Sequence, residues 1–308
     1  MRMASPSAAA SRLLAPAPQT AMTVRRLLQE GVLRLKRAGP SARHEAEWLL
    51  SRLVGVTPLE LYMEEISIPE PIVEHFFSHI EARTSGTPLQ YLLGETEFFG
   101  ERFAVRPDVF IPRPETEVIV EAALQALRSC ATQATRVLRL LDLGTGSGCI
   151  AVTLARRLPS CVVVGVEVSW KALCVARDNV LRHGLSSRVR LVQGRWLDAI
   201  GGLVDGIVSN PPYIPSAQVG RLPLDVRQEP CMSLDGGADG MRELSGLITE
   251  APRVLRPGGI MALECGEEHV SDLVRQAAST HWVQRVIPLH DLAGRPRGLL
   301  MTRHEPGG

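Results

Sequence analysis

Residues 137–158 read Val-Leu-Arg-Leu-Leu-Asp-Leu-Gly-Thr-Gly-Ser-Gly-Cys-Ile-Ala-Val-Thr-Leu-Ala-Arg-Arg-Leu. The part from Val137 to Leu141 is apolar enough for a largely buried strand, and the part from Ile150 to Leu158 has a helical pattern. Between them lies a glycine loop, and glycine permits both the tight turn and the close backbone approach that a bound nucleotide requires. This order of strand, loop and helix predicts the nucleotide-binding turn of an α/β fold.

The spacing of the glycines narrows the class of nucleotide. The pattern is Gly144-x-Gly146-x-Gly148, whereas a dinucleotide fingerprint requires a further glycine where this chain has Cys149. Hydride transfer is therefore disfavoured. Glycines at such a corner can also serve close packing alone, so the loop does not establish a binding site by itself.

An acidic residue at the end of the next strand supports the interpretation. Cys161 to Val166 is a second apolar run, and Glu167 follows it, 25 residues after Asp142. This is near the distance at which an acidic residue accepts the hydroxyls of a bound ribose. The alternative is a glutamate that is merely solvated at a strand end.

A third motif, Val-Ser-Asn-Pro-Pro-Tyr at 208–213, offers hydrogen-bond acceptors after an apolar strand. Asn210 has a side-chain carbonyl, and the two prolines restrict the backbone that carries the carbonyl of Pro211. Two rigid acceptors can hold both hydrogens of an amide or exocyclic NH2 group, and Tyr213 adds a flat wall. Asn-Pro-Pro could also be only a turn. Together with the loop and Glu167, however, the motif predicts an S-adenosylmethionine-dependent N-methyltransferase.

The remaining chain alternates between strand and helix patterns. Such alternation predicts a mostly parallel sheet covered by helices on both faces, with ligands at the carboxyl ends of the strands. We interpret Val254 to Gly259 as a turn before a strand. Strands are expected at 162–167, 189–193, 204–209, 260–264, 282–289 and 298–302, and helices at 171–183 and 269–278.

Composition excludes several other classes of protein. The chain has 308 residues, of which 45% are hydrophobic and 22% charged, and its uncharged run at 143–155 is too short and too rich in glycine to span a membrane. The six cysteines include no Cys-x-x-Cys pair and the histidines show no ligand spacing, so we expect no metal. Without the four arginines of the first 29 residues the formal charge falls from +1 to −3, which argues against direct nucleic-acid binding.

The amino-terminal stretch has a different character. Residues 1–29 contain several Ser and Ala, no acidic residue, and four arginines: Arg2, Arg12, Arg25 and Arg26. This composition is typical of a mitochondrial presequence, which we place at residues 1–22 and which predicts a location in the mitochondrial matrix. The alternative is an unstructured tail, favoured by three prolines, in which case we expect a cytoplasmic protein.

The next part of the chain predicts a small helical domain at residues 23–94. Val24 to Leu35 is amphipathic, a second apolar stripe recurs around Leu49, and Ile72 to Ile80 supplies another. Thr57-Pro58 resembles an N-cap followed by a first-turn proline. A hairpin is expected within a linker at 95–112, and the methyltransferase domain then occupies 113–308.

Four further segments bring the chain close to a known family. They are Pro-Leu-Gln-Tyr-Leu-Leu-Gly at 88–94, Phe-Ile-Pro-Arg-Pro-Glu-Thr-Glu at 110–117, Glu229-Pro230, and Leu-Asp-Gly-Gly-Ala-Asp-Gly at 234–240. With these segments the chain resembles the HemK/PrmC family of release factor glutamine methyltransferases over most of its length. The resemblance implies a seven-stranded, mostly parallel, Rossmann-like class I methyltransferase sheet and a helical domain that recognises the release factor.

The resemblance also implies functional residues. The substrate is expected to be the glutamine of a Gly-Gly-Gln loop in a release factor, and Asn210, Pro211 and Tyr213 are the expected catalytic residues. Substrate binding involves these three and Pro212. The cofactor S-adenosyl-L-methionine is expected to contact Gly144, Thr145, Gly146, Ser147, Gly148, Glu167, Trp196 and Asn210.

This chain departs from the family pattern at two positions. Arg195 stands where an aspartate commonly precedes the aromatic residue, which puts in doubt a carboxylate contact to the adenine amino group. Ser233 replaces a usual alanine. Arg113 and Glu117 could organise the pocket entrance or form a plain salt bridge between domains.

Two other functions are compatible with the same motifs. An adenine-N6 or cytosine-N4 nucleic-acid methyltransferase would use Asn-Pro-Pro-Tyr on a flipped base, but it should carry basic stripes and a target-recognition region. A non-catalytic assembly factor that only binds the cofactor would be favoured by an incomplete acceptor motif, and this motif is intact.

Overall fold

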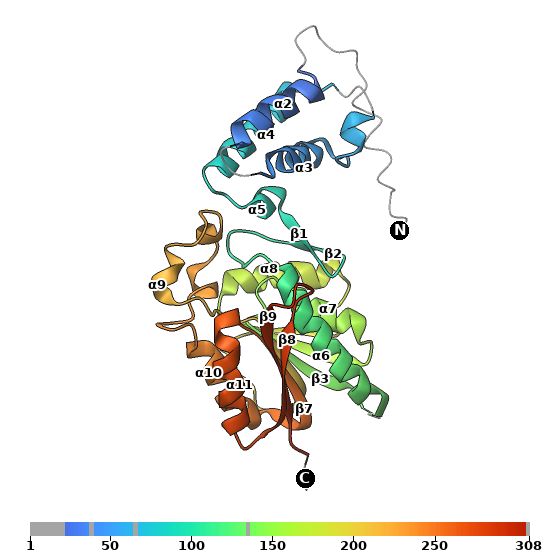
Figure 1. Cartoon of the computed structure of the whole chain (residues 1–308). Helices are drawn as coiled ribbons and strands as arrows, with labels where there is room; N and C mark the ends of the chain where they lie inside the picture. The colour runs from blue at the N-terminus through green and yellow to red at the C-terminus, as the bar shows by residue number, and fades with distance from the viewer. Residues whose placement is uncertain (1–21, 37–39, 64–66, 134–135, 306–308) are drawn as a thin grey trace, which may run out of the picture. The chain divides into compact units, whose positions relative to one another are not determined.

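The computed structural model describes residues 22–36, 40–63, 67–133 and 136–305, so the predicted presequence lies outside the described residues except at its last position. The chain divides into two compact units, Met1–Leu93 and Gly94–Gly308. Both are drawn in Figure 1. Arg25 and Arg26 lie in the first helix of the first unit, so only Arg2 and Arg12 belong to the proposed presequence.

The first unit is a small helical bundle. Its apolar stripes face inward and bury Leu27, Leu49 and Phe76 completely. Helices α2 and α4 pack so closely that a Cβ on Gly31 would lie 2.7 Å from the Phe76 ring. The elements are α2 (Val24–Leu35), α3 (Ala42–Val54), the 3-10 turn η1 (Glu60–Tyr62), α4 (Glu70–Thr84) and α5 (Leu89–Leu93).

The helix start predicted at Thr57-Pro58 is real but short. The Thr57 hydroxyl accepts from the backbone N–H of Glu60, and the Glu60 carboxylate accepts from that of Thr57. This is a capping box. The element that begins there is the 3-10 turn η1 and not an α-helix.

The second unit is built on one seven-stranded sheet in the order β5-β4-β3-β6-β7-β9-β8. Six strands, β3 to β8, run in the same direction, and β9 runs antiparallel to both of its neighbours. The predicted seven-stranded, mostly parallel sheet is confirmed. The strands are β3 (Leu138–Leu143), β4 (Cys161–Glu167), β5 (Val189–Gln193), β6 (Val204–Ser209), β7 (Leu255–Glu264), β8 (Val283–His290) and β9 (Pro296–Arg303).

Helices cover both faces of this sheet (Figure 1). On one face the helices bury residues such as Leu124 and Leu154, and on the other Leu247 and Leu273. The first face carries α6 (Pro114–Gln133), α7 (Cys149–Arg157) and α8 (Trp170–Arg182), and the second carries α10 (Arg242–Glu250) and α11 (Val270–Ser279). Short elements connect them: α9 (Ser216–Val219), η2 (Val226–Gln228), η3 (Cys231–Ser233), η4 (Ala251–Arg253) and η5 (Glu267–His269).

The expected hairpin forms, as β1 (Glu95–Phe98) and β2 (Glu101–Ala104), but it is more than a linker. Phe98 and Phe103 are buried in the core that α6 and α7 share with the sheet. The side chain of Asn179 on α8 bonds both backbone groups of Ala104. Burial of two aromatic rings therefore makes the hairpin part of the second unit.

One expected turn is instead part of a strand. The turn is expected at Val254 to Gly259, but all of these residues after Val254 belong to β7. Val204 pairs with Leu255, and the register then shifts before Gly206. Gly258, at φ 72°, accommodates this bulge. Within the described residues, no helix is long and apolar enough to cross a bilayer.

Candidate active site

The glycine loop is anchored by a buried carboxyl group that precedes it. Asp142, at the end of β3, is fully buried, and its Oδ2 accepts from the Thr145 hydroxyl and from the backbone N–H of Ala151 in α7. Burial, and to a smaller extent nearby Glu167, raise the pKa of Asp142 to about 7, although the hydrogen bonds from Thr145 and Ala151 lower it. One side chain therefore ties strand, loop and helix together.

The three loop glycines have different tasks. All have positive φ values, between 53° and 81°. A Cβ on Gly146 would lie 3.9 Å from the Gly144 carbonyl oxygen, which is an ordinary contact, whereas one on Gly148 would lie 3.2 Å from Ala176 of α8. The absence of a side chain at Gly146 therefore leaves room on the ligand side of the loop, and Gly148 permits helix packing.

Glu167 lies at the end of β4, beside the loop. Its Oε2 accepts from the backbone N–H of Gly146 at 3.1 Å, and its Oε1 accepts from that of Ser169 at 3.0 Å. Each carboxylate oxygen has further lone-pair capacity. The side chain is thus fixed in place and can still accept two ribose hydroxyls.

Trp196 forms a wall opposite the loop. Its ring would lie 3.4 Å from a Cβ on Gly144, and its φ of 47° is uncommon for a residue with a side chain. The indole N–H donates to Oε2 of Glu243 at 2.6 Å. The other oxygen of Glu243 accepts from Arg195 and Arg242.

The Asn-Pro-Pro-Tyr segment follows β6 at the same edge of the sheet. The side-chain NH2 of Asn210 donates to the Thr116 hydroxyl at 3.1 Å. The Tyr213 hydroxyl donates to Oε1 of Glu264 at 3.2 Å. Burial raises the pKa of Tyr213, and the Glu264 carboxyl raises it further.

The glycine-rich loop at 236–240 packs against the Asn-Pro-Pro-Tyr segment. The backbone N–H of Ile214 donates to the carbonyl of Leu234, and the carbonyl of Ile214 accepts from the backbone N–H of Gly236, which forms a parallel bridge between Ile214 and Asp235. A Cβ on Gly236 would lie 2.7 Å from the Cα of Tyr213, and one on Gly240 would lie 2.2 Å from the Tyr213 carbonyl oxygen. Only glycine allows this close approach.

A second buried acid, Glu229, fixes the segment from Phe110 to Arg113. Glu229 accepts from the backbone N–H of Ile111 at 2.9 Å and pairs with Arg113. The Arg113 guanidinium lies over the Phe110 ring. Arg113 therefore does not pair with Glu117, whose carboxylate instead accepts from the backbone N–H of Phe99.

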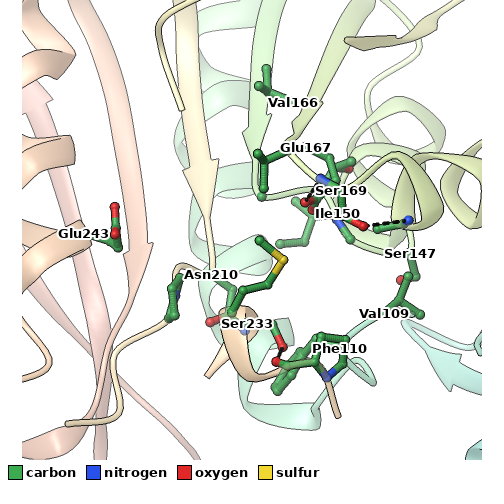
Figure 2. A pocket seen from close by; sticks show the side chains of 18 of the residues that line it. Val109, Phe110, Ser147, Ile150, Val166, Glu167, Ser169, Asn210, Ser233 and Glu243 are labelled. Carbon is green, nitrogen blue, oxygen red and sulfur yellow. Dashed lines mark hydrogen bonds between the residues drawn. The ribbon is translucent and has the colours of Figure 1, made fainter. Parts of the chain in front are cut away.

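These groups surround a cavity of about 530 Å³, a size typical of small-molecule sites. Figure 2 shows Glu167, Ser147 and Asn210 around it, with Phe110 and Ser233 along another side. Of the predicted site residues, eight line the cavity: Gly144, Thr145, Gly146, Ser147, Glu167, Trp196, Asn210 and Pro212.

Three other predicted site residues are not among the residues that line this cavity. Gly148 packs against α8, Pro211 is buried, and Tyr213 is half-buried with its hydroxyl on Glu264. The acceptor role of the Pro211 carbonyl and the wall formed by Tyr213 stay predictions. No cluster of His, Cys, Asp and Glu suited to a metal ion occurs within the described residues.

Both units match known protein families. Residues 26–94 match the PrmC N-terminal domain, and residues 117–221 match the methyltransferase small domain. The release factor glutamine methyltransferase of Moorella thermoacetica is 43% identical over 290 residues, which cover 92% of this chain and all of that relative. The chain belongs to the release factor glutamine methyltransferase family. The relative of the same name from Nitratidesulfovibrio vulgaris is 37% identical over 300 residues, covering 94% of this chain and 98% of its own.

The solved structures support the fold. The catalytic domain of hMettl16, crystallised with an RNA hairpin, superposes with a TM-score of 0.55 at 16% identity and covers 78% of this chain and 83% of its own. At this identity the likeness shows the class I methyltransferase fold alone. The family resemblance predicted from the sequence is confirmed. This member of the release factor glutamine methyltransferase family is an S-adenosyl-L-methionine-dependent methyltransferase.

The cavity fits that cofactor in three respects. The open side of Gly146 leaves room for it, Glu167 can accept ribose hydroxyls, and Trp196 offers a flat apolar surface for an adenine ring. Glu243 adds a carboxylate to the lining near Trp196.

Five residues that hold the site in place are not predicted by the sequence motifs. Asp142 and Glu264 each end an apolar strand, which is the same signal that identified Glu167. Glu229 and Thr116 occur within family segments, but the segments do not indicate the role of either side chain; Thr116 meets its partner across 94 residues. Glu243 carries no local signal, because its partner lies 47 residues away.

Proposed function

We propose that this protein transfers the methyl group of S-adenosyl-L-methionine to the side-chain amide nitrogen of the glutamine in the Gly-Gly-Gln loop of a peptide-chain release factor. One observation carries the proposal: Asn210 lines the same cavity as the glycine loop and Glu167. A group that can hold an NH2 thus lies beside the expected cofactor site. The names of the relatives supply the substrate class.

The amide nitrogen is a poor nucleophile, so the protein has to align it. The cofactor supplies an electrophilic methyl group when it is bound. Oδ1 of Asn210 accepts one N–H of the glutamine, and the carbonyl of Pro211 accepts the other. As the N–CH3 bond forms the S–CH3 bond breaks, and one N–H proton is released to solvent. Alignment of this kind is worth effective molarities of about 10⁵–10⁸ M.

The experiment uses labelled cofactor with three acceptors: a release factor, its Gly-Gly-Gln variant with alanine in place of glutamine, and DNA or RNA. We expect label in the release factor only, at the glutamine identified by mass spectrometry. Label in nucleic acid, or equal label in the alanine variant, would overturn the proposed substrate.

We further propose that residues 1–22 direct the protein to the mitochondrial matrix, with an organellar release factor as substrate. The support is compositional: Arg2 and Arg12 accompany several Ser and Ala without an acidic residue. Residues 1–22 fused to a fluorescent protein should reach mitochondria, and the same segment with both arginines changed to glutamate should not. A diffuse signal from the unaltered fusion would refute the targeting role.

A further inference from the structure

Asn210 can act as an acceptor only if its amide faces the correct way. Its NH2 donates to the hydroxyl of Thr116 at the start of α6, which leaves Oδ1 as the group available to a substrate. The reverse orientation would present NH2 to the substrate NH2, and two donors repel. Something must therefore fix the direction of the bond between Asn210 and Thr116.

Glu264 lies where it can fix that direction. Ser209 pairs with Leu263 in the sheet, so Asn210 and Glu264 follow as neighbours at the ends of β6 and β7. Glu264 is only 2% exposed. Oε1 of its carboxyl group accepts from the Tyr213 hydroxyl, whereas Oε2 is buried and has no other hydrogen-bond partner among the described residues. The Thr116 hydroxyl lies close enough to this carboxyl to lower its pKa, so it is the donor available to Oε2. Both ends of the Asn-Pro-Pro-Tyr segment are thus connected to one side chain.

The chemistry of a carboxylate decides the rest. An ionised carboxylate only accepts hydrogen bonds, so a hydrogen bond between Glu264 and Thr116 can be donated only by the Thr116 hydroxyl. The lone pairs of the Thr116 hydroxyl oxygen then face Asn210, which can donate a hydrogen bond to them only through its side-chain NH2. Oδ1 of Asn210 is directed to the cavity as a result.

We propose that Glu264 is a positioning residue for methyl transfer, because through Thr116 it sets which end of the Asn210 amide faces the substrate. The inference rests on the proposed function, in which Asn210 accepts from the substrate NH2. Glu264 itself does not line the cavity, so it acts through Thr116 and Tyr213.

The relay should depend on pH. Burial is the main cause that raises the pKa of Glu264 to about 7. Glu115 acts in the same direction, whereas Thr116, Tyr213 and Arg297 act to lower the pKa. Cys265 and His269 are the other titratable groups near this carboxyl and the Tyr213 ring. Below about pH 7 the protonated carboxyl can donate to Thr116, which removes the fixed direction. Turnover should therefore fall as the pH drops from 8 to 6.

The test is Glu264→Gln, which keeps the shape of the side chain and gives it a donor. We expect kcat to fall roughly 10-fold or more, with the cofactor Kd within about 2-fold of wild type. The kcat of the variant should also change less with pH between 6 and 8. Circular dichroism and thermal unfolding establish that the variant is folded.

A matched pair at Thr116 covers the case in which Glu264→Gln does not fold. Thr116→Ser keeps the hydroxyl and should retain most of the activity, whereas Thr116→Val removes it and should reduce kcat. Wild-type kcat and pH dependence in Glu264→Gln, or equal activity of the Ser and Val variants, would overturn the inference.

The inference and the proposed function fail in different ways. If the wild type methylates the release factor and Glu264→Gln is equally active, only the positioning role is wrong. If the wild type methylates nucleic acid instead, the proposed function is wrong. In that case the turnover of the wild type and of Glu264→Gln is compared with the nucleic acid as methyl acceptor, and this comparison tests the positioning role of Glu264.

Discussion

The indole N–H of Trp196 donates a 2.6 Å hydrogen bond to the carboxylate of Glu243, 47 residues further along the chain. The same carboxylate accepts from Arg195 and Arg242. Arg195, which stands where the family resemblance leads us to expect an aspartate, thus pairs with an acidic residue of helix α10. Glu243 holds the Trp196 wall in place and supplies negative charge near it.

This arrangement predicts that restoring an acid at position 195 will harm the site. In Arg195→Asp two carboxylates would lie close together, and repulsion should loosen the bond between Glu243 and Trp196. We expect cofactor binding to weaken about 3- to 10-fold in calorimetric titration. Arg195→Ala is the matched control and should change affinity little, since Arg195 is 61% exposed and Arg242 remains bonded to Glu243. Tighter binding by Arg195→Asp would mean that the acid belongs at that position.

The second prediction concerns Glu167 and the ribose. Glu167→Ala removes the acceptor for two backbone amides and for the expected hydroxyls, so cofactor affinity should fall by about 1–3 kcal/mol. Glu167→Gln keeps one acceptor oxygen and should lose less. Titration calorimetry on folded variants measures both, and unchanged affinity in Glu167→Ala would reject the ribose assignment.

The third prediction concerns catalysis by Asn210. Asn210→Ala should reduce methyl transfer by about 10²-fold or more, by analogy with the loss of one oriented hydrogen bond in a transition state. Cofactor affinity should change much less. Assays with labelled cofactor and the release factor measure turnover. Near-normal turnover would return Asn-Pro-Pro to the status of a turn.

Much of the fold follows from local patterns. Buried parallel strands are continuous apolar runs, so β4, β5 and β6 are predicted from the sequence to within one residue. The proline and glycines at the start of β7 predict a turn, and this prediction is wrong, because a bulge within a strand and a turn before it need the same residues. The hairpin was placed correctly, but its packing depends on Phe98 and Phe103, whose contacts are distant in sequence.

The site divides along the same line. Residues that end strands, such as Glu167 and Asn210, follow from the rule that parallel strands present their carboxyl ends at one edge. The partners that orient them do not. Thr116 meets Asn210 across 94 residues, and only the register of β6 against β7 brings Glu264 beside it. The sequence thus predicts the groups that line the cavity better than the groups that hold them in place.

The fourth prediction concerns the helical unit. We expect residues 23–93 to bind the body of the release factor and raise the local concentration of its loop. A protein lacking residues 1–93 should keep its cofactor affinity, because all cavity residues lie in Gly94–Gly308. Its KM for the intact factor should rise at least about 10-fold, while its activity on a short Gly-Gly-Gln peptide stays unchanged. Equal loss on both acceptors would show that the deletion damages the catalytic unit.

The last prediction uses the buried carboxyl of Asp142, whose pKa is raised by burial to about 7. In an unfolded chain this carboxyl titrates near pH 4, so between about pH 4 and 7 the folded protein binds more protons. The free energy of unfolding should therefore decrease as pH rises through this window. Glu264, whose pKa is also raised to about 7, contributes with the same sign.

The variant Asp142→Asn separates the contribution of Asp142 to this pH dependence from that of Glu264. The amide retains an oxygen for Thr145 and Ala151, and its NH2 replaces the proton at Oδ1, which has no hydrogen-bond partner in the structure. The variant imitates the protonated acid, so it should equal the wild type near pH 5 and exceed it at pH 8 by on the order of 1–3 kcal/mol. Urea unfolding at several pH values gives both curves. Parallel curves would mean that Asp142 titrates normally and that its proton plays no part in holding the glycine loop.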